Sequence, residues 1–438
     1  MVIRKISYYR VIVSLCLFMF LLSPVFGDEI SAVSFDKELP ENNIVTIQPD
    51  SLRILHNPLT GWVLYASMGV DAADFWAQYD HMYIPELGHN VSVTDYAHTL
   101  YIRASWTDFN PQEDVYGWKI DSNLRAYIEG AYQRNMRLAF RVVVDSRDKR
   151  TEFTPQFVKD AGAKGFMNKG KWSPYSDDSV FQKYYTKFVK ALAKDFNDPS
   201  KVEFIDGFGL GKWGEYHTMI YSTGDDTPKK AVFDWVTDIY SQAFDKVPVV
   251  INYHRWIGAG KDWVDDEHFA ADSEEMLEEA IKKGYSLRHD AFGMTTYYGS
   301  WERRFAKKYR NICPIIMEGG WIVKSHSYWQ DPRGYRKDSH EDVRRGEFDD
   351  SKEAHVNMMD FRFGDTESWF KDAFDLVRRF LREGGYRLYP SEISLPLEVS
   401  KKTTPTIKHC WNNMGWGYCP TNICLLYTSD AADERSSV

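Results

Sequence analysis

The sequence predicts an α/β protein whose main domain is a (β/α)8 TIM barrel, followed by the start of a truncated small β-sandwich. Eight short apolar runs alternate with helix-like segments, a pattern typical of a parallel sheet. Eight such units over roughly 330 residues favour a closed barrel over an open doubly wound sheet. No glycine-rich dinucleotide fingerprint follows the first run, which weakens the Rossmann alternative.

The strands and helices follow from runs of apolar residues and their spacing. The predicted strands are 61–65, 99–106, 137–145, 202–210, 247–253, 291–298, 313–320 and 353–361. The predicted helices are 122–135, 177–196, 229–245, 273–284, 301–309 and 367–383, with a less regular polar stretch at 338–350. The clearest helix is 177–196, where apolar residues recur at helical spacing and Asp177 can cap the start.

The N-terminus has the pattern of a secretory signal. Arg4, Lys5 and Arg10 precede an apolar run that is short for a membrane span, and Val25–Gly27 fits a small-x-small cleavage site. We therefore expect a secreted or periplasmic protein with no stable membrane anchor after cleavage; an uncleaved anchor is the alternative.

The predicted domains are a signal peptide at 1–27, a lead-in segment at 28–54, the barrel at 55–384, a partial β-sandwich at 385–424 and a tail at 425–438. The tail is small, polar and unpatterned. We interpret it as non-native read-through after a truncated gene.

Charge, cysteine spacing and aromatic content limit the kinds of ligand that we expect. The net charge is −9 and no basic stripe occurs, which argues against a nucleic-acid partner. An exported compartment permits a disulfide between Cys410 and Cys419, whereas their spacing does not fit a metal site. Aromatic residues make up 16% of the chain, which suits stacking on sugar faces; filling the core is the alternative.

A (β/α)8 barrel carries its active site at the C-terminal ends of its strands. Two carboxylates stand out there: Glu215 after the fourth strand and Glu318 at the end of the seventh. Strands four and seven lie across the ring, so both side chains can flank a sugar. A retaining glycosidase needs its two carboxyls about 5–5.5 Å apart, and an inverting one about 6.5–9.5 Å. Trp213 and Tyr216 can bury Glu215 and keep it protonated.

The other candidates are assigned to substrate binding. They are Arg103, Trp106, Arg141, Asp145, Trp213, His217, Asn252, Tyr253, His254, Tyr297 and Trp321. Arg103 and Arg141 orient Glu318 or bind an anionic sugar substituent. Asp206 is expected to form an ion pair inside the barrel. Each aromatic residue has a packing role as its alternative.

Three segments carry a resemblance to a known family. They are the stretch YIRASWTDFNPQEDVYGWKID at 101–121, the residues Asn57, Pro58, Gly61 and Trp62, and GKWGEYH at 211–217. The chain resembles clan A glycoside hydrolases, notably family 42 β-galactosidases, and most of all a bacterial group of glycoside-hydrolase-like barrels with a trailing β-sandwich. The resemblance implies Glu215 as acid/base and Glu318 as nucleophile. The clan usually has Asn before the acid/base, where this chain has Gly214, so His217 or Asn252 would have to replace it.

These observations predict a glycoside hydrolase acting on an oligo- or polysaccharide by a retaining mechanism, with no cofactor and no metal. A non-catalytic carbohydrate-binding barrel is the first alternative, favoured by Gly214. A metal-dependent deacetylase or lyase is the second, which His217 and His254 weakly permit.

Overall fold

The structure is a computed structural model that describes residues 42–147, 151–260, 267–294, 297–320, 340–362, 364–397, 400 and 406–420. The predicted signal peptide, the tail at 425–438 and Trp321 lie outside these residues. The chain divides into two compact units. One comprises Met1–Ser51 with Leu388–Asn413, and the other Leu52–Arg387 with Met414–Val438.

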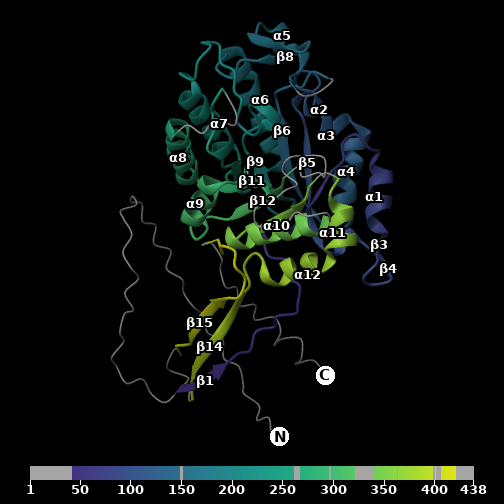
Figure 1. Cartoon of the computed structure of the whole chain (residues 1–438), viewed down its shortest axis with the longest axis vertical. Coiled ribbons are helices and arrows are strands. Elements are labelled where there is room, and N and C mark those ends of the chain that lie inside the picture. Colours follow the sequence, from purple (N-terminus) through teal and green to yellow (C-terminus); the bar gives the residue numbers. More distant parts are fainter. Residues whose placement is uncertain are drawn as a thin grey trace. The chain divides into compact units, whose positions relative to one another are not determined.

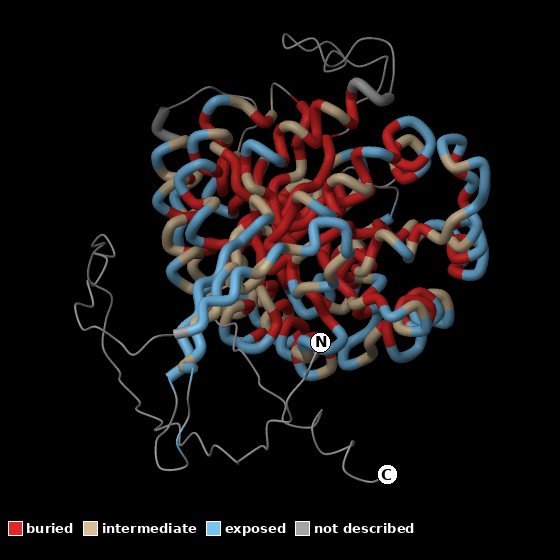
Figure 2. The backbone as a smooth tube through the Cα atoms, turned by 90° about the horizontal axis from the view of Figure 1, so that it is seen from below, coloured by how far each residue is buried: buried red, intermediate tan, exposed pale blue. Residues whose placement is uncertain are grey.

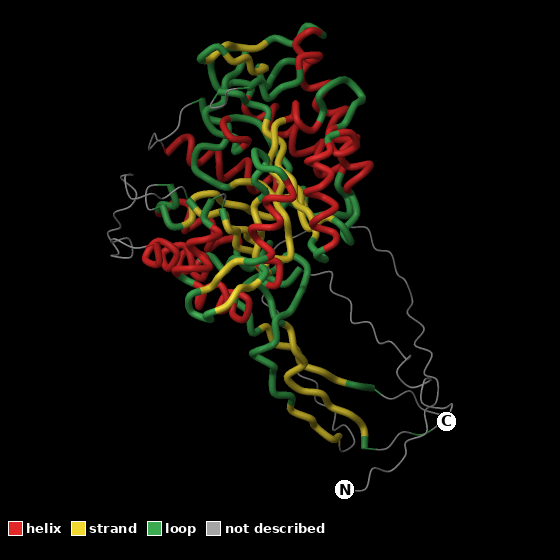
Figure 3. Tube along the Cα trace, turned by 90° about the vertical axis from the view of Figure 1, so that its right-hand side faces the viewer, coloured by secondary structure: helices red, strands yellow, loops and turns green. Residues whose placement is uncertain are grey.

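The larger unit contains a closed barrel of eight strands, which confirms the predicted (β/α)8 fold (Figures 1 and 3). Each strand pairs in parallel with its neighbours, and the last pairs with the first. In barrel order the strands are β2 (Gly61–Tyr65), β5 (Ala97–Ser105), β6 (Arg137–Val143), β9 (Val202–Asp206), β10 (Val249–Asn252), β11 (Ser286–Phe292), β12 (Ile315–Gly319) and β13 (Met358–Phe361).

Helices connect the strands and surround them. They are α1 (Ala72–Asp80), α2 (Trp106–Phe109), α3 (Gly117–Ile120), α4 (Ser122–Gln133), α5 (Gln156–Asp160), α6 (Ser179–Phe196), α7 (Lys229–Ala243), α8 (Glu267–Lys282), α9 (Ser300–Tyr309), α10 (His340–Glu353), α11 (Thr366–Asp372) and α12 (Phe374–Glu383), with 3-10 turns η1 (Val93–Asp95) and η2 (Lys212–Gly214). Two small hairpins, β3 (Met82–Ile84) with β4 (His89–Val91) and β7 (Gly165–Asn168) with β8 (Lys171–Pro174), extend the loops. The cap of α6 is Asp178 rather than Asp177, because the Asp178 carboxylate accepts the Phe181 N–H at 2.9 Å.

The alternation of side chains along each strand produces two apolar layers. Outward residues pack under the helices in one large cluster. Inward residues fill the barrel in a second cluster formed by Leu59, Val63, Tyr65, Tyr101, Ala139, Phe204, Val250, Ile316 and Met358. Figure 2 shows the buried backbone at the centre of the unit and exposed backbone around it. The barrel interior is therefore a packed core, as this fold requires.

The sixth strand differs from the sequence prediction. It spans Ser286–Phe292, whereas the apolar pattern predicted 291–298. The sequence SLRHDAF looks polar because Arg288 and Asp290 occupy inward positions of the strand, where Arg288 forms ion pairs in place of apolar packing. Tyr297 therefore does not lie at the end of this strand.

The smaller unit is one antiparallel sheet in the order β1 (Asn42–Thr46), β14 (Leu388–Pro396), β15 (Lys408–Asn413). Its first strand comes from the predicted lead-in segment. Residues 414–420 belong instead to the barrel unit, where the Trp416 indole donates to the Val356 carbonyl at 3.0 Å. Cys410 of the smaller unit and Cys419 of the barrel unit are both free thiols in the structure. No described helix combines the length and apolar character needed to cross a membrane.

Candidate active site

Polar side chains lie just above the apolar cluster that fills the barrel. On nearly every strand they occupy the inward position that follows the apolar one, toward the strand's C-terminal end. Because side chains alternate, the residue two positions after each inward apolar residue also points inward. These residues are Tyr65, Arg103, Arg141, Asp206, Asn252, Arg288, Glu318 and Asp360. The barrel thus changes from an apolar core to a charged layer within one step along its strands.

Arg141 is the centre of this layer and is completely buried. Its Nε donates to Asp206 at 2.5 Å, and its Nη1 donates to Glu215 Oε1 at 2.9 Å. Its Nη2 lies 3.7 Å from Glu318 Oε2. Since one rigid guanidinium contacts both glutamates, their nearest oxygens are separated by at most about 9 Å. That limit is compatible with either two-carboxylate mechanism of glycoside hydrolysis.

Glu318 is held in its ionised form. Arg288 Nη2 donates to Glu318 at 2.6 Å and to Asp360 at 2.8 Å. Burial alone would raise the pKa of Glu318, but the guanidinium groups of Arg288, Arg141 and Arg103 outweigh burial and lower it. Burial and the negative charge of Glu318 raise the pKa of Asp360 to about 8.

Glu215 lies on a tightly wound loop, not on a solvated one. Residues 209–218 leave β9 with positive φ angles at Gly209, Gly211, Trp213, Gly214, Tyr216 and Thr218. Three of these residues have side chains, for which that conformation is uncommon and costs energy. Backbone hydrogen bonds close the loop, from Tyr216 N–H to the Leu210 carbonyl at 2.9 Å and from Gly258 N–H to the Tyr216 carbonyl at 2.8 Å. The buried Tyr216 ring, edge-on to Phe208, anchors it.

Gly214 fits this loop for a steric reason. Its φ is +78°, and a Cβ there would lie 3.3 Å from the Gly209 Cα and 3.5 Å from the Arg141 Cδ. An asparagine side chain at this position would press against the backbone that shapes the loop. The departure from the clan pattern therefore matches the local geometry.

The surroundings of Glu215 keep it protonated. The residue is only 3% exposed. Burial, followed by the charge and hydrogen bond of Asp290, raises the pKa of Glu215 to about 8, against the opposing effects of His217 and Arg141. The two glutamates thus have pKa values displaced in opposite directions.

Asp290 is a site residue that sequence reasoning missed. It follows Arg288 by two positions on β11, and its negative charge is one cause of the raised pKa of Glu215. Burial would raise the pKa of Asp290, but the hydrogen bond from Glu215 lowers it. The misplacement of the sixth strand concealed Asp290; inward alternation from Arg288 could have revealed it.

Two histidines support the Glu215 loop. His254 Nε2 donates to the Glu215 carbonyl at 2.7 Å, and its Nδ1 accepts the Trp256 N–H at 3.2 Å. His254 is thereby a neutral tautomer that fixes the backbone of Glu215. His217 Nε2 lies 3.4 Å from Glu215 Oε2, so this predicted residue contacts the Glu215 carboxyl group.

Arg103 and the backbone of Trp213 are in contact beside Glu215. Arg103 donates to the Trp213 carbonyl at 3.0 Å and to the Tyr65 hydroxyl at 3.3 Å, and lies 3.9 Å from Glu215. Its side chain is 23% exposed, whereas Arg141 and Arg288 are fully buried in ion pairs. Arg103 is therefore the most accessible guanidinium of this charged layer.

Asn252 has a buried amide with unused hydrogen-bonding capacity. It is 1% exposed, and neither its nitrogen nor its oxygen has a partner among the described residues. Buried amides are normally paired, so an unpaired one at a strand end is a candidate for contact with a ligand or water.

Two of the predicted sugar platforms are packing residues. Trp106 is fully buried with its ring edge-on to Tyr185 at 5.2 Å, under the helices. Tyr253 is fully buried and stacks on Phe305 of α9. Neither ring can meet a sugar, because outward-facing side chains at these positions join the core between strands and helices. Tyr297 is partly buried against Trp256.

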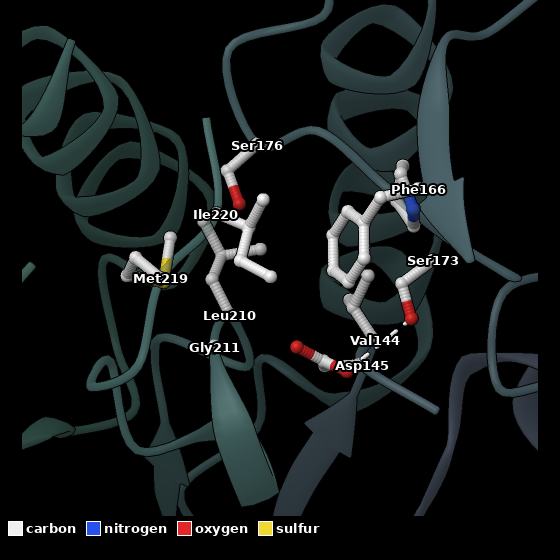
Figure 4. Close-up of a pocket in the computed structure, with 10 residues that line it drawn as sticks. Val144, Asp145, Phe166, Ser173, Ser176, Leu210, Gly211, Met219 and Ile220 are labelled. Carbon is white, nitrogen blue, oxygen red and sulfur yellow. Dashed lines mark hydrogen bonds between the residues drawn. The ribbon is translucent and has the colours of Figure 1, made fainter. Parts of the chain in front are cut away.

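Asp145 lies in a separate small pocket beside the Glu215 loop (Figure 4). Phe166 and Ser173 of the β7–β8 hairpin lie on one side, and Leu210, Met219 and Ile220 on the other. Asp145 pairs with Arg147 at 2.6 Å and accepts the Ser173 hydroxyl at 3.2 Å. The pocket is not formed by Glu215 or Glu318. Across the described ranges, no group of three or more metal-ligating side chains is arranged to hold an ion.

Comparison with known proteins gives distant structural likenesses only. No family model and no curated protein matches the sequence. The chain is similar to an endo-1,4-beta-xylanase from Caldicellulosiruptor owensensis, with 11% identity, 69% of this chain and 84% of that chain covered, and a TM-score of 0.39. It is similar to an exo-beta-1,4-mannosidase from Opitutaceae bacterium strain TAV5, with 12% identity, coverages of 77% and 58%, and a TM-score of 0.42. It is also similar to an endo-glycoceramidase II from Rhodococcus sp., with 13% identity, coverages of 76% and 79%, and a TM-score of 0.42. Scores this low do not distinguish one barrel enzyme from another, so the case for a function rests on the site.

Proposed function

We propose that the protein is a retaining glycoside hydrolase in which Glu318 is the nucleophile and Glu215 the acid/base. One observation carries this proposal. Glu215 has a pKa raised to about 8, the neighbouring Glu318 has a lowered pKa, and one guanidinium contacts both. Two carboxyl groups whose surroundings drive their pKa values apart are the arrangement that glycoside hydrolysis uses.

The proposed reaction has two steps. In the first, Glu318 attacks the anomeric carbon while Glu215 gives its proton to the departing glycosidic oxygen. In the second, Glu215 takes a proton from water, the resulting hydroxide attacks the anomeric carbon, and Glu318 leaves as a carboxylate. Both steps need only side chains of this chain, so we propose no cofactor.

The substrate class is proposed on weaker grounds. Arg103 is partly exposed beside Glu215, and Asn252 has unused hydrogen-bonding groups. Both suit the hydroxyl groups of an oligo- or polysaccharide, and Asn252 can take the role of the asparagine that Gly214 replaces. A β-galactosidase-like specificity and a secreted or periplasmic location remain part of the proposal, supported by the motifs and the N-terminal signal pattern.

A second candidate is a carbohydrate-binding barrel without activity. It is favoured by the burial of Glu215 and Glu318, which are each 3% exposed, and by their ion pairs with Arg141 and Arg288. In this case the charged layer would be a structural network, which buried arginines and carboxylates also form.

Activity on a panel of aryl glycosides tests the proposal. The hydrolase predicts release from at least one of them, lost in Glu318→Gln. Glu129→Gln is the matched control, since it makes the same substitution at an exposed carboxylate of α4 that pairs with Arg125. Sugar binding by calorimetry without release from any glycoside would establish the binding barrel instead.

A further inference from the structure

A side chain of β5 holds the backbone of the loop that carries Glu215. Arg103 Nη2 donates to the Trp213 carbonyl at 3.0 Å, and the same nitrogen lies 3.9 Å from Glu215 Oε1. The other terminal nitrogen, Nη1, donates to the Tyr65 hydroxyl of β2 at 3.3 Å. Because a guanidinium is planar and rigid, these two bonds fix the direction in which Nη2 points. Arg103 therefore ties the Glu215 loop to two strands of the barrel wall.

Trp213 is a strained point of this loop. Its φ is +59° and its ψ is +6°, a left-handed conformation that is an outlier for a bulky side chain. Such a conformation persists where the surrounding structure holds it in place. Lys212 Nζ lies 4.1 Å from the centre of the Trp213 ring and the His217 ring is edge-on at 5.5 Å, but both residues belong to the same loop. The bond from Arg103 comes instead from the barrel.

The contacts of Arg103 do not fit the role of orienting Glu318. Glu318 pairs with Arg288 at 2.6 Å and with Arg141 at 3.7 Å. Among the described residues, no ion pair joins Glu318 to Arg103. Arg141 is the partner of Arg103 in the register of β5 and β6. These neighbouring arginines have different targets, since Arg141 donates to the Glu215 carboxyl group and Arg103 to the backbone two residues before it.

We propose that Arg103 is a positioning residue for Glu215, because it holds the strained Trp213 peptide and thereby keeps the Glu215 carboxyl beside the departing oxygen of the glycoside. This inference rests on the proposed function. Without the bond the loop can relax at Trp213, and the carboxyl two residues later moves with it. A displacement of about 1 Å is enough to slow a reaction about 100-fold. Glu318 keeps its own partners, so its attack on the anomeric carbon is unaffected.

Hydrogen exchange in the full chain without substrate tests the hold on the loop. Arg103→Lys keeps the positive charge but loses the fork that bonds Trp213 and Tyr65 together. We expect amide exchange in a peptide covering 211–218 to accelerate about 10-fold or more, because the backbone bonds that close the loop open more often. A peptide covering β12 should exchange as in the wild type. Arg125→Lys is the matched control, since it makes the same substitution at an exposed arginine of α4.

Leaving-group dependence tests whether the effect passes through Glu215. In Arg103→Lys, kcat/KM should fall about 10- to 100-fold for aryl glycosides with poor leaving groups. It should fall less than about 3-fold for dinitrophenyl glycosides, which need no protonation. Equal losses across the series would show that Arg103 acts on the sugar or on Glu318, and they overturn the proposal.

Unchanged exchange in folded Arg103→Lys also overturns the proposal. If Arg103→Lys does not fold, Tyr65→Phe removes the hydroxyl that orients the same guanidinium and gives the same two readings. The exchange measurement needs no turnover, so the two proposals can fail separately. Faster exchange confined to the loop in a protein that cleaves no glycoside retains the hold of Arg103 on the loop and rejects the hydrolase. Hydrolysis with unchanged exchange retains the hydrolase and rejects the positioning role.

Discussion

Glu215 and Glu318 share one guanidinium: Arg141 Nη1 lies 2.9 Å from the first, and Nη2 lies 3.7 Å from the second. Glu215 comes from the loop after β9 and Glu318 from β12 itself, and these two strands are three apart in barrel order. Arg141 also pairs with Asp206, and Arg288 pairs with Glu318 and Asp360, so carboxylates hold both of these buried guanidinium groups.

The proposed roles of the two glutamates predict different losses of activity with good and poor leaving groups. Glu318→Gln should reduce kcat/KM about 10⁴-fold or more for every substrate, because no covalent intermediate can form. Glu215→Gln should reduce it about 10²–10⁴-fold for poor leaving groups and much less for dinitrophenolate, which needs no protonation. Initial rates over a series of aryl glycosides measure this. Equal losses across the series in Glu215→Gln would remove Glu215 from the acid role.

The pH dependence of activity follows from the two displaced pKa values. Activity should fall above about pH 8, where Glu215 loses its proton, and on the acidic side only below the ordinary range of a glutamate, where Glu318 gains one. The profile of kcat/KM against pH measures both limbs. An alkaline limb near pH 5 would show that Glu215 is not held protonated.

Stability should also depend on pH through Glu215. The unfolded chain releases this proton near the ordinary value of about 4.3, whereas the folded chain holds it to about pH 8. Between these values the folded state binds more protons, so the free energy of unfolding falls as pH rises. Thermal unfolding from pH 5 to 8 should therefore show a shallower decline in Tm for Glu215→Gln than for the wild type. Parallel declines would contradict the raised pKa.

The role of Gly214, the glycine before Glu215, can be tested against a matched glycine. Gly214 and Gly224 have φ angles of +78° and +79°, but only Gly214 has atoms close to a Cβ. Substitution by Ala should cost each about 1–2 kcal/mol of backbone strain. Only Gly214→Ala should also lower activity, by about 100-fold, because it displaces Glu215. Denaturant unfolding and kcat/KM of both variants decide this, and equal activities would show that the loop tolerates a side chain.

The strand pattern was predictable where apolar residues dominate. Seven of the eight strands fall within the predicted runs or overlap them closely, because both faces of a barrel strand are buried. Strand β11 was displaced, since Arg288 and Asp290 occupy inward positions that a hydrophobicity pattern expects to be apolar. The burial of Arg288 depends on ion pairs with β9, β12 and β13, which are distant in sequence.

The site residues were predictable where they follow strands that the apolar pattern identifies. Strand order placed Glu215 after the fourth strand and Glu318 at the end of the seventh, and the expected ion pair of Asp206 inside the barrel is confirmed by its contact with Arg141. The direction of a ring at a strand end could not be predicted, because one residue decides whether it enters the barrel or the helix layer. The rings of Trp106 and Tyr253 enter the helix layer.

The most direct test of the central claim is the intact mass of Glu215→Gln incubated with a dinitrophenyl glycoside. Glu318 should attack and lose the good leaving group, and the second step should stall without its base. We predict a mass increase of one glycosyl unit, located by peptide mapping to Glu318 and absent when Glu318→Gln is added to the same chain. Release of dinitrophenolate with no glycosyl-enzyme, or a label on another residue, would contradict the account.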